Sequence, residues 1–70
     1  MTLGERIFNI RQAKKLTQQG LAKSSGVDAT IISCIENDKR TNLQMETITR
    51  LATGLGVTVS TLTDGVDFRS

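Results

Sequence analysis

The stretch that decides the fold is QQGLAKSSGVDATIISCIEN, residues 18–37. Gly26 stands near its middle, where glycine supplies a turn of positive φ without steric strain. Ala22, four residues earlier, is small enough to let one helix pass close to another. We therefore expect two short helices, at about 18–24 and 29–37, joined by a tight turn.

Capping residues mark where the first three helices begin. Thr17 and Asp28 precede the two central segments, and both residue types accept hydrogen bonds from the first backbone N–H groups of a helix. Thr2 and Glu5 have the spacing of a capping box, which predicts another helix at about 3–14.

Two more helices are expected after the central stretch. Asn42 or Gln44 opens the first of them and Gly56 stops it, and Thr58 caps the second. Within the first, apolar residues recur at helical spacing: Met45, Ile48, Leu51, Ala52 and Leu55. Five short helices predict the all-α class and a compact orthogonal bundle.

Length and composition exclude several functional classes. Seventy residues suit one domain, which we place at 1–63 with a short C-terminal tail at 64–70. Cys34 is the single cysteine and histidine is absent, so we expect no internal disulfide, metal or cofactor, and no small-molecule ligand is evident. No nucleophile–base pairing or glycine-rich phosphate loop is recognisable, which argues against an enzyme. The lack of a long apolar run argues against a membrane segment and favours a cytoplasmic protein.

The charge is unevenly distributed along the chain. Of the net charge of +2, residues 1–40 contribute +3 and residues 41–70 contribute −1. A basic N-terminal half is compatible with a polyanionic partner. Ordinary solvated helix faces explain the same distribution equally well.

The helix expected at 29–37 has two contrasting faces. Successive residues advance by about 100° around a helix, so five small or polar residues fall on one arc of about 140°. These residues are Ala29, Thr30, Ser33, Cys34 and Asn37, and the isoleucines at 31, 32 and 35 fall opposite. A small, uncharged, hydrogen-bonding face suits close approach to base edges in a DNA major groove. A surface helix with short side chains is the alternative.

The combined pattern resembles the Cro/repressor-type (XRE-like) helix-turn-helix DNA-binding family over about residues 3–63. The matching residues are Arg11 to Gln18, Leu21-Ala22, Gly26-Val27, Ile32-Ser33, Ile35-Glu36-Asn37, Lys39-Arg40, Asn42, Thr47, Leu51-Ala52 and Leu55-Gly56-Val57. This resemblance implies a lambda-repressor-like five-helix fold whose third helix enters the major groove.

The resemblance also implies roles for individual residues. Those that correspond to base-facing positions are Ala29, Thr30, Ser33 and Cys34. Those that correspond to contacts with the sugar-phosphate backbone are Gln18, Asn37, Lys39, Arg40 and Asn42. Arg11 and Glu36 match a partly buried ion pair that ties the first helix to the end of the third.

Several positions depart from the family pattern. Ser25 replaces a frequently apolar residue, which we expect to loosen the turn. Asp38 stands where glycine is common, although Asp tolerates the left-handed conformation better than most residues. The base-facing row lacks the Gln and Arg that make bidentate base contacts, so we expect A/T-containing half-sites read with help from DNA shape.

We therefore predict a sequence-specific transcription regulator, a repressor or autoregulator, that binds double-stranded DNA with a palindromic operator as a homodimer. The apolar C-terminal quarter offers a dimer interface, for which the candidates are Leu55, Val59, Leu62 and Phe68. The alternative is a protein-interaction module that uses the same fold without reading DNA. A phage repressor, an antitoxin and a restriction-modification controller are equally compatible with the sequence.

Overall fold

Five helices follow one another along the chain in the computed structural model, which describes residues 1–40 and 43–66. They are α1 (Leu3–Ala13), α2 (Gln18–Ser25), α3 (Ala29–Glu36), α4 (Met45–Leu55) and α5 (Val59–Thr63). The all-α class and the bundle of five short helices predicted from the sequence are confirmed. Two of the predicted site residues, Asn42 and Phe68, lie outside the described residues.

Side-chain caps account for the starts of four helices. Thr2 Oγ1 accepts a hydrogen bond from Glu5 N at 3.1 Å, and Thr17 Oγ1 accepts one from Gly20 N at 2.9 Å. Asp28 and Thr58 cap α3 and α5 in the same way. These bonds satisfy N–H groups that have no partner within the helix. Each predicted helix start that rested on a cap therefore agrees with the structure.

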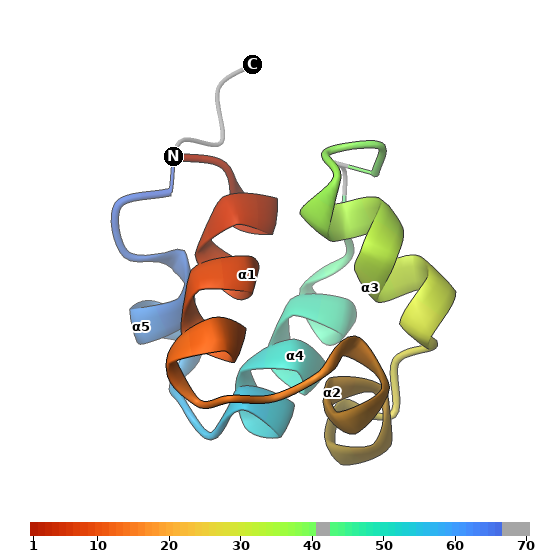
Figure 1. Cartoon of the computed structure of the whole chain (residues 1–70). Coiled ribbons are helices and arrows are strands. Elements are labelled where there is room, and N and C mark those ends of the chain that lie inside the picture. Colours follow the sequence, from red (N-terminus) through yellow and green to blue (C-terminus); the bar gives the residue numbers. More distant parts are fainter. Residues whose placement is uncertain (41–42, 67–70) are drawn as a thin grey trace.

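The isoleucine and leucine side chains of all five helices meet in one core. Figure 1 shows α3 on one side of the bundle and α5 on the other, with α1 and α4 between them. The core contains Leu3, Ile7, Leu21, Val27, Ile32, Ile35, Ile48, Leu51, Ala52, Leu55 and Leu62. Each fully buried aliphatic side chain contributes roughly 2 kcal/mol to folding. No helix within residues 1–40 and 43–66 is long and apolar enough to cross a membrane.

Two of the predicted dimer-interface residues belong to this core. Leu55 is 1% exposed and Leu62 is not exposed at all, so neither side chain has a surface to offer to a second chain. The prediction that these two leucines form a subunit interface is wrong, because Leu55 on α4 and Leu62 on α5 both lie in the core of the bundle. Val59, by contrast, is only partly buried.

Glycines allow two close approaches that hold α3 and α2 in place. A Cβ atom at Gly4 would overlap the backbone carbonyl oxygen of Ile35, so α1 passes directly against the end of α3. A Cβ atom at Gly54 would lie 2.6 Å from the Cβ of Ser25, where α4 meets α2. Ser25 is buried there, and its Oγ accepts a hydrogen bond from Val27 N at 3.1 Å. The expectation that Ser25 loosens the turn is therefore wrong, because its hydroxyl closes the turn.

Candidate nucleic-acid interface

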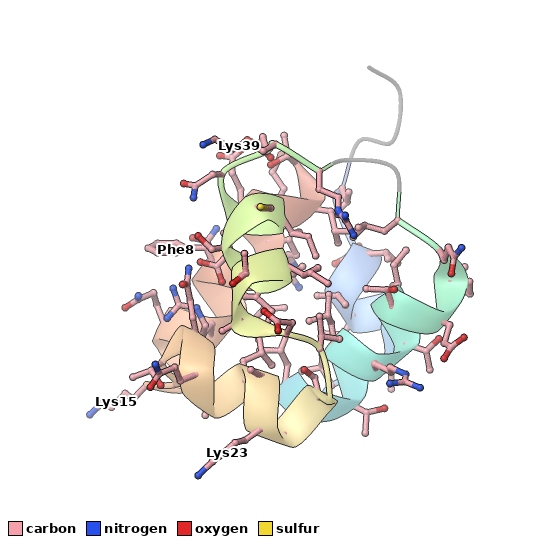
Figure 2. The ribbon with its side chains drawn as sticks, turned by 90° about the vertical axis from the view of Figure 1, so that its right-hand side faces the viewer. Phe8, Lys15, Lys23 and Lys39 are labelled. Carbon is pink, nitrogen blue, oxygen red and sulfur yellow. The ribbon has the colours of Figure 1, made fainter. Side chains whose placement is uncertain are left out.

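The outward side of α3 carries small side chains. Ile32 and Ile35 are 0% and 1% exposed and fix the opposite side of the helix in the core. Thr30 is exposed, and the three neighbouring positions Ala29, Ser33 and Cys34 are half-buried. In Figure 2, α3 lies at the front of the molecule with α2 below it. The helix backbone can therefore approach a flat or grooved partner closely, because no long side chain stands between them.

The last turn of α3 is held by the side chain of Asn37. Its Nδ2 donates to the carbonyl oxygen of Ser33 at 2.9 Å and more distantly, at 3.4 Å, to the Ser33 hydroxyl oxygen. Asp38 follows with φ of 58°, the left-handed conformation expected from the sequence. This turn directs the chain away from the helix and leaves Lys39 and Arg40 exposed.

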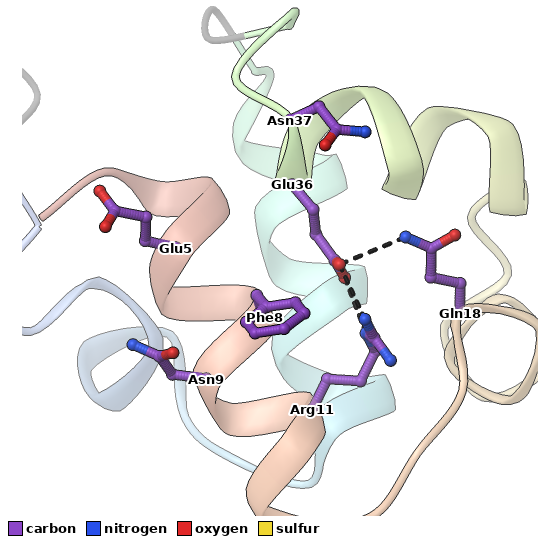
Figure 3. A pocket seen from close by; sticks show the side chains of 7 residues that line it. All are labelled: Glu5, Phe8, Asn9, Arg11, Gln18, Glu36 and Asn37. Carbon is purple, nitrogen blue, oxygen red and sulfur yellow. Dashed lines mark hydrogen bonds and ion pairs between the residues drawn. The ribbon is translucent and has the colours of Figure 1, made fainter.

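Arg11 joins three elements at the back of this interface. Its Nε and Nη2 donate to the two carboxylate oxygens of Glu36 at 2.8 and 2.9 Å, and its Nη1 donates to the carbonyl oxygen of Leu16 at 2.8 Å. Gln18 Nε2 donates to Glu36 Oε1 at 3.3 Å (Figure 3). We call Arg11, Leu16, Gln18 and Glu36 the Arg11 cluster. It connects α1, the loop before α2, the start of α2 and the end of α3.

The Arg11–Glu36 pair is largely removed from water. The two side chains are 8% and 5% exposed. The hydrogen bonds to Glu36 raise the pKa of the Arg11 guanidinium above its ordinary value, burial opposes this, and the charge of Glu36 adds to the increase. The guanidinium therefore stays protonated, and the two-point contact fixes the orientation of both side chains.

Basic side chains follow the small-residue face at one end. Figure 2 shows Lys39 beyond the end of α3, whereas Lys15 and Lys23 point outward from the far side of α2. Sequence reasoning assigned no role to Lys15 or Lys23. The face is thus uncharged in its centre, with the exposed carboxylate of Asp28 at its start and the exposed side chains of Lys39 and Arg40 after its end. The basic end suits contact with a polyanion.

A hollow of about 510 Å³ lies beside this face, between α1 and the ends of α2 and α3. Figure 3 shows the side chains that line it, which are Glu5, Phe8, Asn9, Arg11, Gln18, Glu36 and Asn37. Gln18 and Asn37, predicted from the resemblance to contact the DNA backbone, thus share one hollow. Among the described residues no group of His, Cys, Asp and Glu is arranged to hold a metal ion.

Comparison with known proteins gives one consistent result. The helix-turn-helix family model matches residues 7–62. The immunity repressor protein of Bacillus phage phi105 is 39% identical over 62 residues, which cover 89% of this chain and 42% of the phage protein. The chain spans about half or less of the length of the curated relatives it matches.

Two solved structures share the fold over most of the chain. The restriction-modification controller protein C.AhdI from Aeromonas hydrophila superimposes with a TM-score of 0.80 and 35% identity, covering 86% of this chain and 89% of that one. A chain of the SinR protein/SinI protein complex gives a TM-score of 0.83 and 31% identity, covering 91% of this chain and 62% of that one.

Removing one partner of the buried ion pair tests how much the site depends on it. We expect Glu36→Gln to lower the free energy of unfolding by about 3 kcal/mol, because Arg11 is left buried without its counter-charge. The exposed pair Arg50–Glu46 provides a matched control, since its side chains are 54% and 70% exposed. Glu46→Gln should cost less than about 0.5 kcal/mol. Urea unfolding followed by circular dichroism measures both, and equal losses would contradict this account.

Proposed function

This chain belongs to the XRE-type helix-turn-helix family of DNA-binding regulators, and from that premise we propose that it recognises a specific DNA sequence through α3. The observation that carries this proposal is the outward face of α3, which is uncharged and built of short side chains. The opposite side of the same helix is buried and holds it in a fixed position. An α-helix of this kind fits the major groove, where each base pair presents a distinct pattern of donors, acceptors and methyl groups.

Four residues of α3 are proposed to read the bases. Thr30 and Ser33 each offer a hydroxyl that donates or accepts a hydrogen bond, and Ala29 offers a methyl group for contact with thymine. Cys34 adds a small, half-buried thiol to the same face. Since none of these side chains makes a bidentate contact, sequence-dependent DNA shape supplies part of the discrimination. We infer half-sites that contain A/T base pairs.

A second set of residues is proposed to hold the sugar-phosphate backbone. Gln18 lies at the start of α2, where free N–H groups and the helix dipole also favour an anion. Asn37, Lys39 and Arg40 follow α3 and are exposed. Asn42 belongs to this set by its position in the sequence. Contacts of this kind supply affinity and set the register of α3 in the groove, but carry no direct base information.

We further propose that two copies bind a palindromic operator. One eight-residue helix reads only a few base pairs, and discrimination against a genome requires more contacts than that. Two copies related by a twofold axis would place their α3 helices one helical turn apart, roughly 34–36 Å. Of the four interface residues predicted from sequence, two are buried in the core and one lies outside the described residues. Val59 in α5 therefore remains the candidate for the dimer interface.

The proposed regulatory effect is repression or autoregulation. A protein bound over an operator blocks access to that stretch of DNA, and the phi105 relative is named an immunity repressor. This proposal concerns the DNA-binding region, since the curated relatives are longer than this chain.

Salt dependence separates the two proposed kinds of DNA contact. On a duplex selected from a random pool, affinity should fall steeply between about 50 and 200 mM salt. Lys39→Ala should make the logarithmic slope shallower by about 0.9, because one phosphate contact is lost. Thr30→Ala should leave the slope unchanged and reduce the preference for the selected duplex over an unrelated one by about 1–3 kcal/mol.

Fluorescence anisotropy measures all these affinities, and both substituted residues are exposed, so neither change disturbs the core. Equal affinity of the wild type for selected and unrelated duplexes would contradict sequence-specific binding. A flat salt dependence would favour the alternative in which the same fold binds a protein.

Half-site spacing tests the palindromic dimer. Native mass spectrometry should show two chains on the selected duplex. Inserting about five base pairs between the half-sites turns one of them to the far side of the helix, so cooperative binding should be lost. An insertion of about ten base pairs is the matched control. It returns both half-sites to the same side of the DNA helix, so part of the cooperativity should be recovered. One chain per duplex, with affinity independent of the insertion, would contradict the dimer.

A further inference from the structure

We propose that Gly4 is a positioning residue for base recognition, whose missing side chain sets where the end of α3 lies. This inference rests on the DNA-binding function proposed above. Gly4 is buried at the start of α1, so it has no surface to offer to DNA. Its influence on the choice between DNA sequences is therefore exerted through the position of α3.

Gly4 touches both the last turn of α3 and the residue that redirects the chain after it. A Cβ atom at Gly4 would overlap the carbonyl oxygen of Ile35 and would lie 3.0 Å from Asp38 Oδ1. The same carbonyl oxygen accepts a hydrogen bond from Asp38 N at 3.1 Å, within the turn that leads to Lys39 and Arg40. Because the obstacle is a backbone atom, no change of rotamer relieves the overlap, and the two helices must separate.

The first turn of α1 is held in place from its other side. Glu5 N donates to Thr2 Oγ1 at 3.1 Å within the capping box. Arg6 ties this turn to α5, because its Nη2 and Nε donate to the carbonyl oxygen of Thr61 at 2.8 and 3.3 Å. α1 contacts both α3 and α5 and lies between them (Figure 1), whereas the outward side of α3 has no helix in front of it. A Cβ atom at residue 4 should therefore displace the end of α3.

The Arg11 cluster converts this displacement into a tilt of α3. Glu36 stays bonded to Arg11, which lies about 10 Å further along α1 than Gly4. One contact thus holds the end of α3 while the other pushes it. Hydrogen bonds to base edges span about 2.7–3.2 Å, so a shift of about 0.5 Å at Thr30 or Ser33 weakens them. Long basic side chains can follow a phosphate through the same shift by changing rotamer.

A role for Gly4 in stability alone leads to a different expectation. Partial unfolding removes binding-competent chains, which weakens the apparent affinity for every duplex by the same factor. The ratio of the affinities for the selected duplex and an unrelated one then stays constant. This ratio, which we call the preference, separates positioning from stability.

The test compares Gly4→Ala with the wild type on both duplexes by fluorescence anisotropy. The preference should fall about tenfold, which equals the loss of one good base contact. Affinity for the unrelated duplex, corrected for the folded fraction, should stay near the wild-type value because phosphate contacts supply it. Leu62→Val is the control, since Leu62 is buried in α5 on the side of the bundle opposite α3 (Figure 1). It should lower the urea midpoint and keep the wild-type preference.

A second variant releases α1 from α5. Arg6→Ala combined with Gly4→Ala should be less stable than Gly4→Ala alone, yet should regain part of the preference, since α1 can then retreat from α3. Concentrated sucrose favours the folded state and allows the same measurements if either variant is largely unfolded in buffer.

Three results would count against the positioning role. These are an unchanged preference in Gly4→Ala, an equal loss of preference in Leu62→Val, and no recovery when Arg6→Ala is added. A wild-type chain that does not prefer the selected duplex would instead overturn the proposed function itself.

Discussion

The buried pair of Arg11 and Glu36 is the constraint on which the candidate interface depends. α2 and α3 have eight residues each, too few for a helix to be stable in water by itself. Their positions are therefore set by what they contact. The Arg11 cluster fixes the start of α2 and the end of α3 to α1 at once, through hydrogen bonds of 2.8–3.3 Å. Because desolvating two charges is costly, the value of this pair lies in geometry more than in net stability.

The two sides of α3 differ in how strongly the fold constrains them. Ile32 and Ile35 contribute burial, and Gly4 lets α1 touch the end of the helix, so this side tolerates little change. The outward side has few packing constraints, so its residues can vary with little effect on stability. In our account affinity comes from Gln18 and the basic loop after α3, while the small face of α3 and the shape of the DNA discriminate between sequences.

Caps and turn glycines were predictable because their chemistry is local. Thr2, Thr17 and Asp28 act within three residues, and Gly26 has φ of 75° as its position suggested. The Arg11–Glu36 pair is a tertiary contact that only the family resemblance indicated, and the structure contains it. Other features that depend on tertiary contact were not predictable. Periodicity identified Leu55 and Leu62 as apolar but could not tell the chain's own core from a second chain. The hydrogen bond from Arg11 to the carbonyl oxygen of Leu16 involves the backbone, so no residue type in the sequence indicates it. The exposure of Phe8 depends on how α1 packs against the other helices.

The most direct test of the central claim is an amide NMR titration of this chain with a duplex that contains one half-site of the selected sequence. Our account predicts that the largest shifts occur at Thr30 and Ser33 in α3, with further shifts at Gln18 and Lys39, while Ser60 in α5 changes little when one chain binds a half-site duplex. Shifts concentrated in α5, with α3 unchanged, would contradict the proposal that the face positioned by Arg11 and Glu36 reads DNA.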